Sequence, residues 1–318
     1  EYANFIKKNY LRNNSKIIEI GSNDGTCLQN FKDTNIDYIG FEPSSNVAKL
    51  ANTNGVKTLN NFFNLNSINL IEDYKKQTDV IYAANVICHV PDLKNLIKTV
   101  DELLSSNGVF IFEEPYLGSI FEKTSYDQIY DEHIFIFSGS SVKKIFEMFD
   151  MDLIDLKKQP THGGSMRYIV GRKGKHKINN SVDQILDEEK RKNLDNIAAC
   201  NTFKENCENS KKNLNKNLMK LKNEGKKIIG YGATSKSTTI LNYCQINEKI
   251  IEYICDTTKE KIGKFSPGMH IPIVSNDHFK LDNPDIAFLF AWNHKDEIFN
   301  KEKDFIKKNG KWISHVKI

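Results

Sequence analysis

A tyrosine, a glutamate and a histidine lie within four residues of one another in the stretch Asp127–His133. These side chains, Tyr130, Glu132 and His133, come directly before the alternating apolar stretch Ile134–Ser138. A histidine can remove a proton near neutral pH when a carboxylate orients it, and a tyrosine hydroxyl can donate a hydrogen bond to an enolate oxygen. The stretch therefore predicts general-base chemistry, with a hydrogen-bonded structural corner as the alternative.

Two further histidines lie in polar loops. His89 follows the predicted strand 79–84, where a helix cap or a structural loop histidine is the alternative interpretation. The second, His162, begins the run His-Gly-Gly-Ser-Met-Arg that ends at Arg167. Its two glycines let backbone N–H groups face a ligand, and the arginine can meet an anion. A plain turn between strands is the alternative for this run.

A glycine loop joins the first predicted strand, 16–20, to the rest of the chain. It reads Gly-Ser-Asn-Asp-Gly over 21–25, and the next strand ends in Glu42. A carboxylate after the second strand can accept both hydroxyl groups of a ribose. The loop lacks the third glycine of the dinucleotide fingerprint, and Asp24 would repel a pyrophosphate. These features favour S-adenosylmethionine (SAM) over a dinucleotide, although any α/β protein can close a strand with Gly-x-x-x-Gly.

Two more positions strengthen the SAM interpretation. Phe62, beside Asn61, follows a predicted third short strand, where an aromatic ring can stack on adenine. Asn85 ends the strand 79–84, close to where the methionine part of SAM would lie at the carboxyl ends of the strands. The predicted cofactor contacts are Glu19, Gly21, Ser22, Asn23, Gly25, Glu42, Asn61, Phe62 and Asn85.

A second glycine loop, Gly230–Lys236, follows another predicted strand. Its backbone donors, together with Ser235 and Lys236, fit a phosphate at a helix N-terminus. It also lacks the third glycine of the dinucleotide fingerprint, so by itself it is a weak motif. The next strand, 250–255, ends in Asp256 and repeats the pattern of the first half of the chain.

The elements that position these residues form two predicted α/β domains joined by helices. Residues 1–175 alternate strands and helices, which predicts a doubly wound, Rossmann-like parallel sheet with an antiparallel edge. Residues 176–224 are charged and carry a thin apolar stripe, which predicts a bridge of one or two long helices or an interaction helix for a second subunit. Residues 225–318 predict a second, smaller α/β domain.

Composition excludes several classes of protein. The chain has 318 residues, and its net charge of +4 comes from scattered lysines, so we expect no nucleic-acid partner. Its longest apolar run, 286–292, is too short to span a bilayer, so we expect no membrane partner. The six cysteines form no C-x-x-C pair, which predicts neither a metal site nor a disulfide framework. With no signal-peptide pattern, these features favour the cytoplasm.

Taken in order, these segments resemble the SAM-dependent C-methyltransferases that act on nucleoside-diphosphate keto-deoxysugars. The matching stretches begin at Glu19, Gly40, Ala84, Phe112, Asp127, His162 and Gly230, and they cover almost the whole chain. The Tyr-x-Glu-His and His-Gly-Gly-Ser pieces are specific, whereas the first glycine loop is common to many methyltransferases.

The resemblance implies a role for each group of residues. It implies that the first half binds SAM, that His133 is the general base, and that Tyr130, Glu132 and His89 surround the reacting carbon. It also implies that the C-terminal α/β domain helps to hold the nucleotide. The implied substrate contacts are Glu114, Tyr116, His162, Gly163, Ser165, Arg167, Tyr231, Ala233, Ser235 and Lys236.

Two departures from the family stand out. Members commonly carry an N-terminal cysteine-rich zinc domain, which this chain lacks; it begins at Glu1 and is either a fragment or a branch without that domain. Ser237 stands where the family usually has a glycine after the lysine, which puts phosphate or sugar contacts of that loop in question.

The competing hypotheses for the function are methylation of a sugar oxygen or amine, and a SAM- or nucleotide-binding module without turnover. The oligomeric state stays open.

Overall fold

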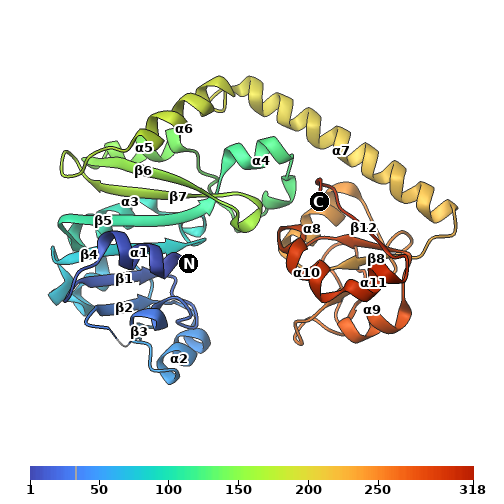
Figure 1. The fold of residues 1–318 in the computed structure, drawn as a ribbon, viewed down its shortest axis with the longest axis horizontal. Helices are drawn as coiled ribbons and strands as arrows, with labels where there is room; N and C mark the ends of the chain where they lie inside the picture. The colour runs from blue at the N-terminus through green and yellow to red at the C-terminus, as the bar shows by residue number, and fades with distance from the viewer. Residues whose placement is uncertain (33) are drawn as a thin grey trace. The chain divides into compact units, whose positions relative to one another are not determined.

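The computed structural model describes residues 1–32 and 34–318 and divides into two compact units (Figure 1). Unit 1 comprises Glu1–Leu117, Ile134–Pro160 and Gly164–Asp195, and unit 2 comprises Gly118–His133, Thr161–Gly163 and Asn196–Ile318. These units differ from the predicted division at 175 and 224, because two short segments of the predicted first domain pack into unit 2. The predicted helical bridge is also divided, with its first part in unit 1.

Unit 1 is built on a seven-stranded sheet with the order β3-β2-β1-β4-β5-β7-β6. Its strands are β1 (Lys16–Ile20), β2 (Asp37–Phe41), β3 (Thr58–Leu59), β4 (Thr78–Ala84), β5 (Leu104–Pro115), β6 (Met151–Gln159) and β7 (Ser165–Arg172). The strands from β3 to β5 pair in parallel, and β7 runs antiparallel to both β5 and β6. The predicted parallel sheet with an antiparallel edge is therefore confirmed.

Apolar residues on both faces of this sheet explain its helical layers. Alternate residues of β1 point to opposite sides, with Ile18 and Ile20 in one core and Ile17 in the other. The first core includes α3 (Leu93–Leu103) and α5 (Gly139–Glu147), and the second includes α1 (Tyr2–Tyr10). The other helices of unit 1 are α2 (Ser45–Thr53), α6 (Asn180–Arg191) and the 3-10 turns η1 (Leu28–Phe31), η2 (Leu65–Leu70), η3 (Glu72–Tyr74) and η4 (Ile87–His89).

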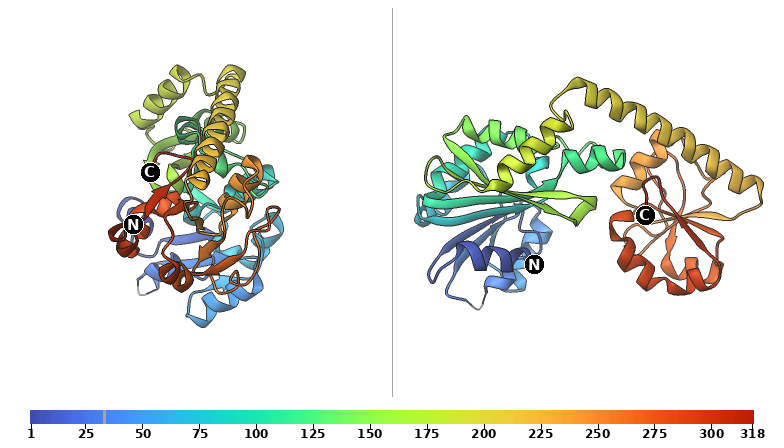
Figure 2. Two further views of the ribbon diagram at one scale, coloured as in Figure 1. Left: turned by 90° about the vertical axis from the view of Figure 1, so that its right-hand side faces the viewer. Right: turned by 45° about the horizontal axis from the view of Figure 1, so that its top comes forward.

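Unit 2 contains a five-stranded parallel sheet with the order β10-β9-β8-β11-β12. Its strands are β8 (Ile228–Tyr231), β9 (Ile254–Asp256), β10 (Ile273–Ser275), β11 (Ile286–Leu289) and β12 (Lys311–Ile313). The chain order of the strands across this sheet is the same as that across the first five strands of unit 1. Figure 2 gives two further views of this sheet and its helices. The predicted second α/β domain is confirmed.

The helices of unit 2 include one much longer than the rest. They are α4 (Leu117–Lys123), α7 (Ile197–Asn223), α8 (Ser235–Cys244), α9 (Asn276–Asp282), α10 (Lys295–Lys301), α11 (Lys303–Lys307) and the turns η5 (Tyr126–Gln128), η6 (Thr161–Gly163) and η7 (Trp292–His294). The N-terminal part of α7 packs on α4, where the rings of Phe203 and Phe121 stack at 4.6 Å. The prediction of long helices between the two sheets is confirmed. No helix in the described part of the chain is long and apolar enough to cross a membrane.

One predicted strand is shorter than its sequence pattern indicates. Residues 250–255 were expected to form a strand, but β9 covers only Ile254–Asp256. The N–H groups of Ile250 and Ile251 both donate to the carbonyl of Asn247, so a turn at 248–250 takes up the start of the predicted strand. Ile251 is nevertheless fully buried, which explains why its sequence resembles that of a buried strand.

Candidate functional sites at the two sheet edges

Glu42 lies just past the end of β2, where its carboxylate is held by backbone N–H groups. Its Oε2 accepts a hydrogen bond from the N–H of Asn23 at 3.1 Å, and its Oε1 accepts one from the N–H of Ser44 at 2.8 Å. Each carboxylate oxygen has two acceptor positions, so the same group can also accept ribose hydroxyls. The structure thus joins the glycine loop to the predicted ribose-binding carboxylate.

The glycines of this loop are required by its geometry. Gly21 has a φ of +67°, and a Cβ at this position would lie 2.5 Å from Cγ2 of Val86. Gly25 has a φ of +84°, which side chains rarely adopt. The loop after β1 therefore packs directly against the loop after β4. A larger residue at position 21 would separate two loops at the predicted cofactor edge.

Two other predicted cofactor contacts lie at this edge of unit 1. The side chain of Phe62 is 68% exposed, whereas the neighbouring Phe63 is buried against Phe41, with ring centroids 5.3 Å apart. Asn85 has a φ of 56°, and its buried Oδ1 atom has no hydrogen-bond partner in the described part of the chain. An available aromatic face and an unused amide oxygen both fit SAM, which carries an adenine ring and an ammonium group. Asn61 is also exposed.

Glu19 and Ser22 have a different environment from the other predicted cofactor contacts. The Glu19 side chain is buried, and its Oε2 accepts a hydrogen bond from the Tyr82 hydroxyl at 3.1 Å. Burial raises the pKa of Glu19 to about 8, although the tyrosine hydrogen bond opposes this shift. The Ser22 hydroxyl is buried above Gly40, where an added Cβ would lie 2.4 Å from it. Ser22 as a whole is 2% exposed, so its hydroxyl faces the interior of unit 1.

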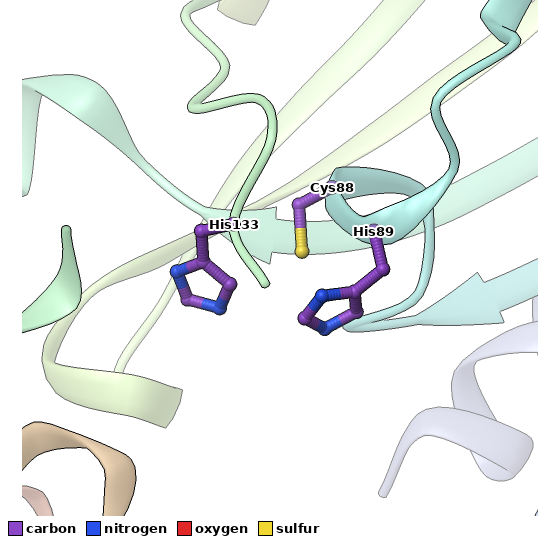
Figure 3. Close-up of side chains that lie close together, drawn as sticks. All are labelled: Cys88, His89 and His133. Carbon is purple, nitrogen blue, oxygen red and sulfur yellow. The ribbon is translucent and has the colours of Figure 1, made fainter. Parts of the chain in front are cut away.

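Glu114 supports the turn that carries His89. It is fully buried, and its Oε1 accepts hydrogen bonds from the N–H groups of Val86 at 3.0 Å and Ile87 at 2.6 Å. Burial raises the pKa of Glu114, although hydrogen bonds from the Cys88 thiol and nearby N–H groups oppose this shift. Figure 3 shows His89 and Cys88 projecting from η4. The carboxylate thus holds the loop rather than facing an open pocket.

Three other predicted substrate contacts are also buried in unit 1. The Tyr116 hydroxyl donates to Oε1 of Glu189 at 3.0 Å. The guanidinium group of Arg167 forms an ion pair with Glu113 and lies over two aromatic rings of α1, at 4.2 and 4.6 Å. Ser165 is 1% exposed. Internal partners therefore neutralise Arg167 and occupy the Tyr116 hydroxyl, so we interpret these residues as support for the fold around the site.

The segment 118–133 carries three of the four predicted catalytic residues in unit 2, whereas His89 belongs to unit 1. Nδ1 of His133 lies 2.8 Å from the carbonyl oxygen of Gln128. Because a carbonyl only accepts hydrogen bonds, Nδ1 carries the hydrogen of this contact, and in the neutral ring Nε2 is the nitrogen without a hydrogen. The Tyr130 ring lies beside the imidazole, with centroids 4.0 Å apart, and Glu132 is exposed. Figure 3 labels His133 in this segment.

Asp256 is a candidate that the sequence analysis noted only as a strand end. Its Oδ2 accepts a hydrogen bond from the N–H of Ala233 at 2.7 Å, and its Oδ1 accepts one from the N–H of Thr258 at 2.8 Å. It lines a cavity of about 310 Å³ at the carboxyl ends of β8, β9 and β11. Tyr231, also in this lining, donates its hydroxyl to Oε1 of Glu302 at 2.9 Å. A strand followed by a carboxylate was the signal that could have identified Asp256.

Lys236 supplies a buried positive charge near the second glycine loop. Its Nζ donates to Oδ1 of Asn293 at 3.1 Å and lies 4.9 Å from the centre of the Trp292 ring. Burial lowers the pKa of this lysine, and the negative charge of Asp127 opposes the change. Ser235, the first residue of α8, is exposed. A buried ammonium beside a helix N-terminus favours an anionic ligand.

His162 and Gly163 belong to this same unit through η6. The backbone of His162 has a φ of 52°, and a Cβ on Gly163 would lie 2.0 Å from the Trp292 ring. Burial lowers the pKa of His162 to about 4, and the positive charges of Lys236 and His294 add to this effect. His162 is therefore neutral at pH 7 and faces other basic groups, which is an arrangement that an arriving anion would stabilise.

Two family models together match nearly the whole chain. A methyltransferase domain matches residues 1–156, and a C-methyltransferase C-terminal domain matches residues 160–316. The C-methyltransferase NovU from Streptomyces niveus is 29% identical over 298 residues, which cover 93% of this chain and 71% of that protein.

Solved structures resemble about half of the chain. The YcgJ protein from Bacillus subtilis is 12% identical, and the match covers 54% of this chain and 97% of that chain with a TM-score of 0.43. An S-adenosylmethionine-dependent methyltransferase from Clostridium acetobutylicum is 15% identical, and the match covers 54% of this chain and 91% of that chain with a TM-score of 0.43.

Proposed function

Because the chain belongs to the SAM-dependent C-methyltransferases, we propose that it methylates a carbon next to the ketone of a nucleoside-diphosphate keto-deoxysugar. The observation that supports this most directly is the tautomer of His133. Its Nδ1 hydrogen is directed to the Gln128 carbonyl at 2.8 Å, so in the neutral ring Nε2 is the nitrogen that carries no hydrogen and has the basic lone pair.

Proton removal is the first chemical step in this proposal. Nε2 of His133 takes a proton from the carbon next to the ketone, and the electron pair of that C–H bond forms an enolate. Tyr130 donates a hydrogen bond to the enolate oxygen, and Glu132 and His89 orient the reacting groups. When bound, SAM supplies a methyl group that the enolate carbon can attack as its bond to sulfur breaks.

We assign SAM to the carboxyl edge of unit 1. Glu42 would accept the ribose hydroxyls, Phe62 would pack on the adenine, and Asn85 would use its free Oδ1 on the methionine part. Support comes from the backbone hydrogen bonds that hold Glu42 and from the 68% exposure of Phe62. The acidic, lysine-free loop at 21–25 suits a ligand that carries no phosphate.

We assign the nucleotide part of the substrate to unit 2. The cavity of about 310 Å³ beside Asp256 offers a ribose-binding carboxylate, and Lys236 offers a positive charge for the diphosphate. His162 lies near this lysine. The pairing of a hydroxyl-binding acid with buried basic groups fits a sugar nucleotide better than an uncharged sugar.

Solvent exchange of the substrate hydrogen tests the base directly. In D2O and without SAM, the wild-type protein should exchange the hydrogen next to the ketone of a nucleoside-diphosphate 4-keto-6-deoxyhexose. His133→Ala should slow this exchange roughly 10²- to 10⁴-fold, the usual contribution of a general base. His278→Ala, which removes an exposed histidine of the same unit, is the matched control and should exchange at the wild-type rate. Full exchange by His133→Ala would show that another group is the base.

The position of the new methyl group separates carbon from heteroatom methylation. With SAM labelled by ¹³C in its methyl group, product NMR should show the label bonded to a ring carbon. An O–CH3 or N–CH3 signal would instead indicate a sugar O- or N-methyltransferase. Binding of SAM without any labelled product across a panel of sugar nucleotides would favour a binding module.

A further inference from the structure

The carboxylate of Asp127 connects the segment 118–133 to the C-terminal sheet within unit 2. Its side chain is fully buried in η5. Oδ2 accepts a hydrogen bond from Nε1 of Trp292 at 2.7 Å, and Oδ1 lies 3.0 Å from Nε2 of His315. Trp292 begins the turn after β11, and His315 follows β12. A single carboxylate thus contacts two segments that are more than 160 residues away in sequence.

Neighbouring contacts reinforce this connection. The Tyr126 ring packs edge-on against the rings of Tyr243 and His315, each at 5.1 Å between centroids. Burial by itself would raise the pKa of Asp127, but the His315 hydrogen bond and the positive charge of Lys236 outweigh it, so the net pKa is lowered. The group therefore remains a carboxylate, and the N–H of Trp292 points at a full negative charge.

Asp127 is followed directly by the residue that orients the proposed base. The carbonyl of Gln128, the last residue of η5, accepts the Nδ1 hydrogen of His133 at 2.8 Å. A shift of η5 would move this carbonyl and release the histidine ring. We propose that Asp127 is a positioning residue, which fixes η5 on the C-terminal sheet and so sets the tautomer of His133. This inference rests on the proposed function only where it concerns catalysis.

Histidine ¹⁵N NMR measures the tautomer without any substrate. The whole chain has eight histidines, so selective ¹⁵N-histidine labelling gives a small set of signals, and His133→Gln identifies the one of interest. The wild-type protein should show His133 with hydrogen on Nδ1. Asp127→Asn should convert this signal to a mixture of the two tautomers. A purely structural role for Asp127 would lower stability without changing this signal in the folded protein.

Catalysis should respond in the same direction as the tautomer. Asp127→Asn should lower the rate of solvent exchange next to the substrate ketone about 10²-fold, as expected when a catalytic group is misplaced by about 1 Å. The affinity for SAM should stay at the wild-type value. Asp131→Asn is the matched control, because it makes the same chemical change at an exposed position of the same segment. It should leave both the tautomer and the exchange rate unchanged.

Trp292→Phe provides a second variant that keeps an aromatic ring but removes the N–H donor. It should shift the His133 tautomer in the same direction, with a loss of roughly tenfold in exchange, as for one hydrogen bond to a charged group. If Asp127→Asn does not fold, the His133 tautomer and the exchange rate of Trp292→Phe test the positioning role in its place. A folded variant with an unchanged tautomer and exchange within twofold of wild type would overturn the positioning role. Exchange retained in His133→Ala would instead overturn the proposed base.

Discussion

The carboxyl edges of the two sheets have the same backbone arrangement around an acidic residue. In both units, the first strand of the sheet along the chain is followed by a glycine loop, and the carboxylate lies at the end of the neighbouring strand, just after β2 in unit 1 and as the last residue of β9 in unit 2. Each carboxylate accepts one hydrogen bond from an N–H group of the glycine loop, that of Asn23 for Glu42 and that of Ala233 for Asp256. It accepts a second from the N–H group two residues after the carboxylate itself, that of Ser44 for Glu42 and that of Thr258 for Asp256. The four distances lie between 2.7 and 3.1 Å.

The two edges differ in the segment that comes after the loop. In unit 1 the chain continues through Asp24 and Gly25 before the turn η1 begins at Leu28, so the loop is longer and contains an acidic residue. In unit 2 the helix α8 begins at Ser235, two residues after Ala233, and places the buried Lys236 near the edge. We therefore propose that a shared frame binds a ribose in both units, and that the loop determines whether the rest of the ligand is free of phosphate or carries a diphosphate. Three predictions test this comparison.

The largest effect is expected from filling the space at Gly21. Gly21→Ala puts an alanine in the left-handed backbone conformation and brings its Cβ within 2.5 Å of Val86. It should therefore lower the free energy of unfolding by about 2–5 kcal/mol. Gly174→Ala is the control, because Gly174 has a φ of +69° with no atom within 4 Å of its Cβ. It should lower the free energy of unfolding by only about 1–2 kcal/mol, because it adds the left-handed backbone strain alone. Denaturant unfolding gives both values.

Unit 2 supplies the comparison for this experiment. Gly232 has a φ of +92°, but its added Cβ would lie 3.0 Å from that of Ala291, a milder contact. We expect Gly232→Ala to fall between the other two variants. Equal losses for Gly21→Ala and Gly174→Ala would mean that the close approach of the two loops in unit 1 is not required.

Removing one carboxylate at a time should weaken the binding of one ligand and leave the affinity for the other unchanged. Glu42→Ala should weaken SAM binding roughly 10- to 100-fold, as for the loss of hydrogen bonds to a charged group, and leave nucleotide binding unchanged. Asp256→Ala should do the reverse. Titration calorimetry with SAM and with the nucleoside diphosphate measures both affinities. A loss of SAM affinity in Asp256→Ala would show that the two edges have been assigned to the wrong ligands.

The last prediction concerns Glu19, in the strand that precedes the first glycine loop. Glu19 is a buried acid whose pKa is raised to about 8, so the folded state keeps its proton while the unfolded state loses it near pH 4.5. The free energy of unfolding should therefore fall as the pH rises from about 4.5 to 8, by at most about 1.4 kcal/mol per pH unit. Glu19→Gln should flatten this part of the stability profile. An unchanged profile would show that Glu19 is ionised in the folded protein.

The sequence was sufficient to predict features that depend on local pattern. Short apolar strands alternating with helices predicted both sheets, and the strand at 16–20 with its glycine loop was placed correctly. The turn at 248–250 was not predicted to reach into the strand pattern, because the buried side chain of Ile251 directly after it gives this segment the composition of a strand. Apolar pattern reports burial, and it does not report which backbone groups are hydrogen-bonded.

Polar partners were harder to predict than strands. Arg167 and Tyr116 have the residue types of ligand contacts, but their partners, Glu113 and Glu189, lie 54 and 73 residues away in sequence. The docking of Asp127 depends in the same way on Trp292. Pairing over such distances is decided by tertiary packing, so a single sequence identifies polar residues without showing whether a ligand or the protein itself satisfies them.

The way the chain alternates between the units limits how this protein can be recombined. Each unit is made of three segments, so the chain passes from one unit to the other five times. A chimera joined between residues 156 and 160, where the two family models meet, would take Trp292 and His315 from one parent and Asp127 from the other. We therefore expect a chimera that exchanges the C-terminal half to keep these contacts only if the segment 118–133 is transferred with it.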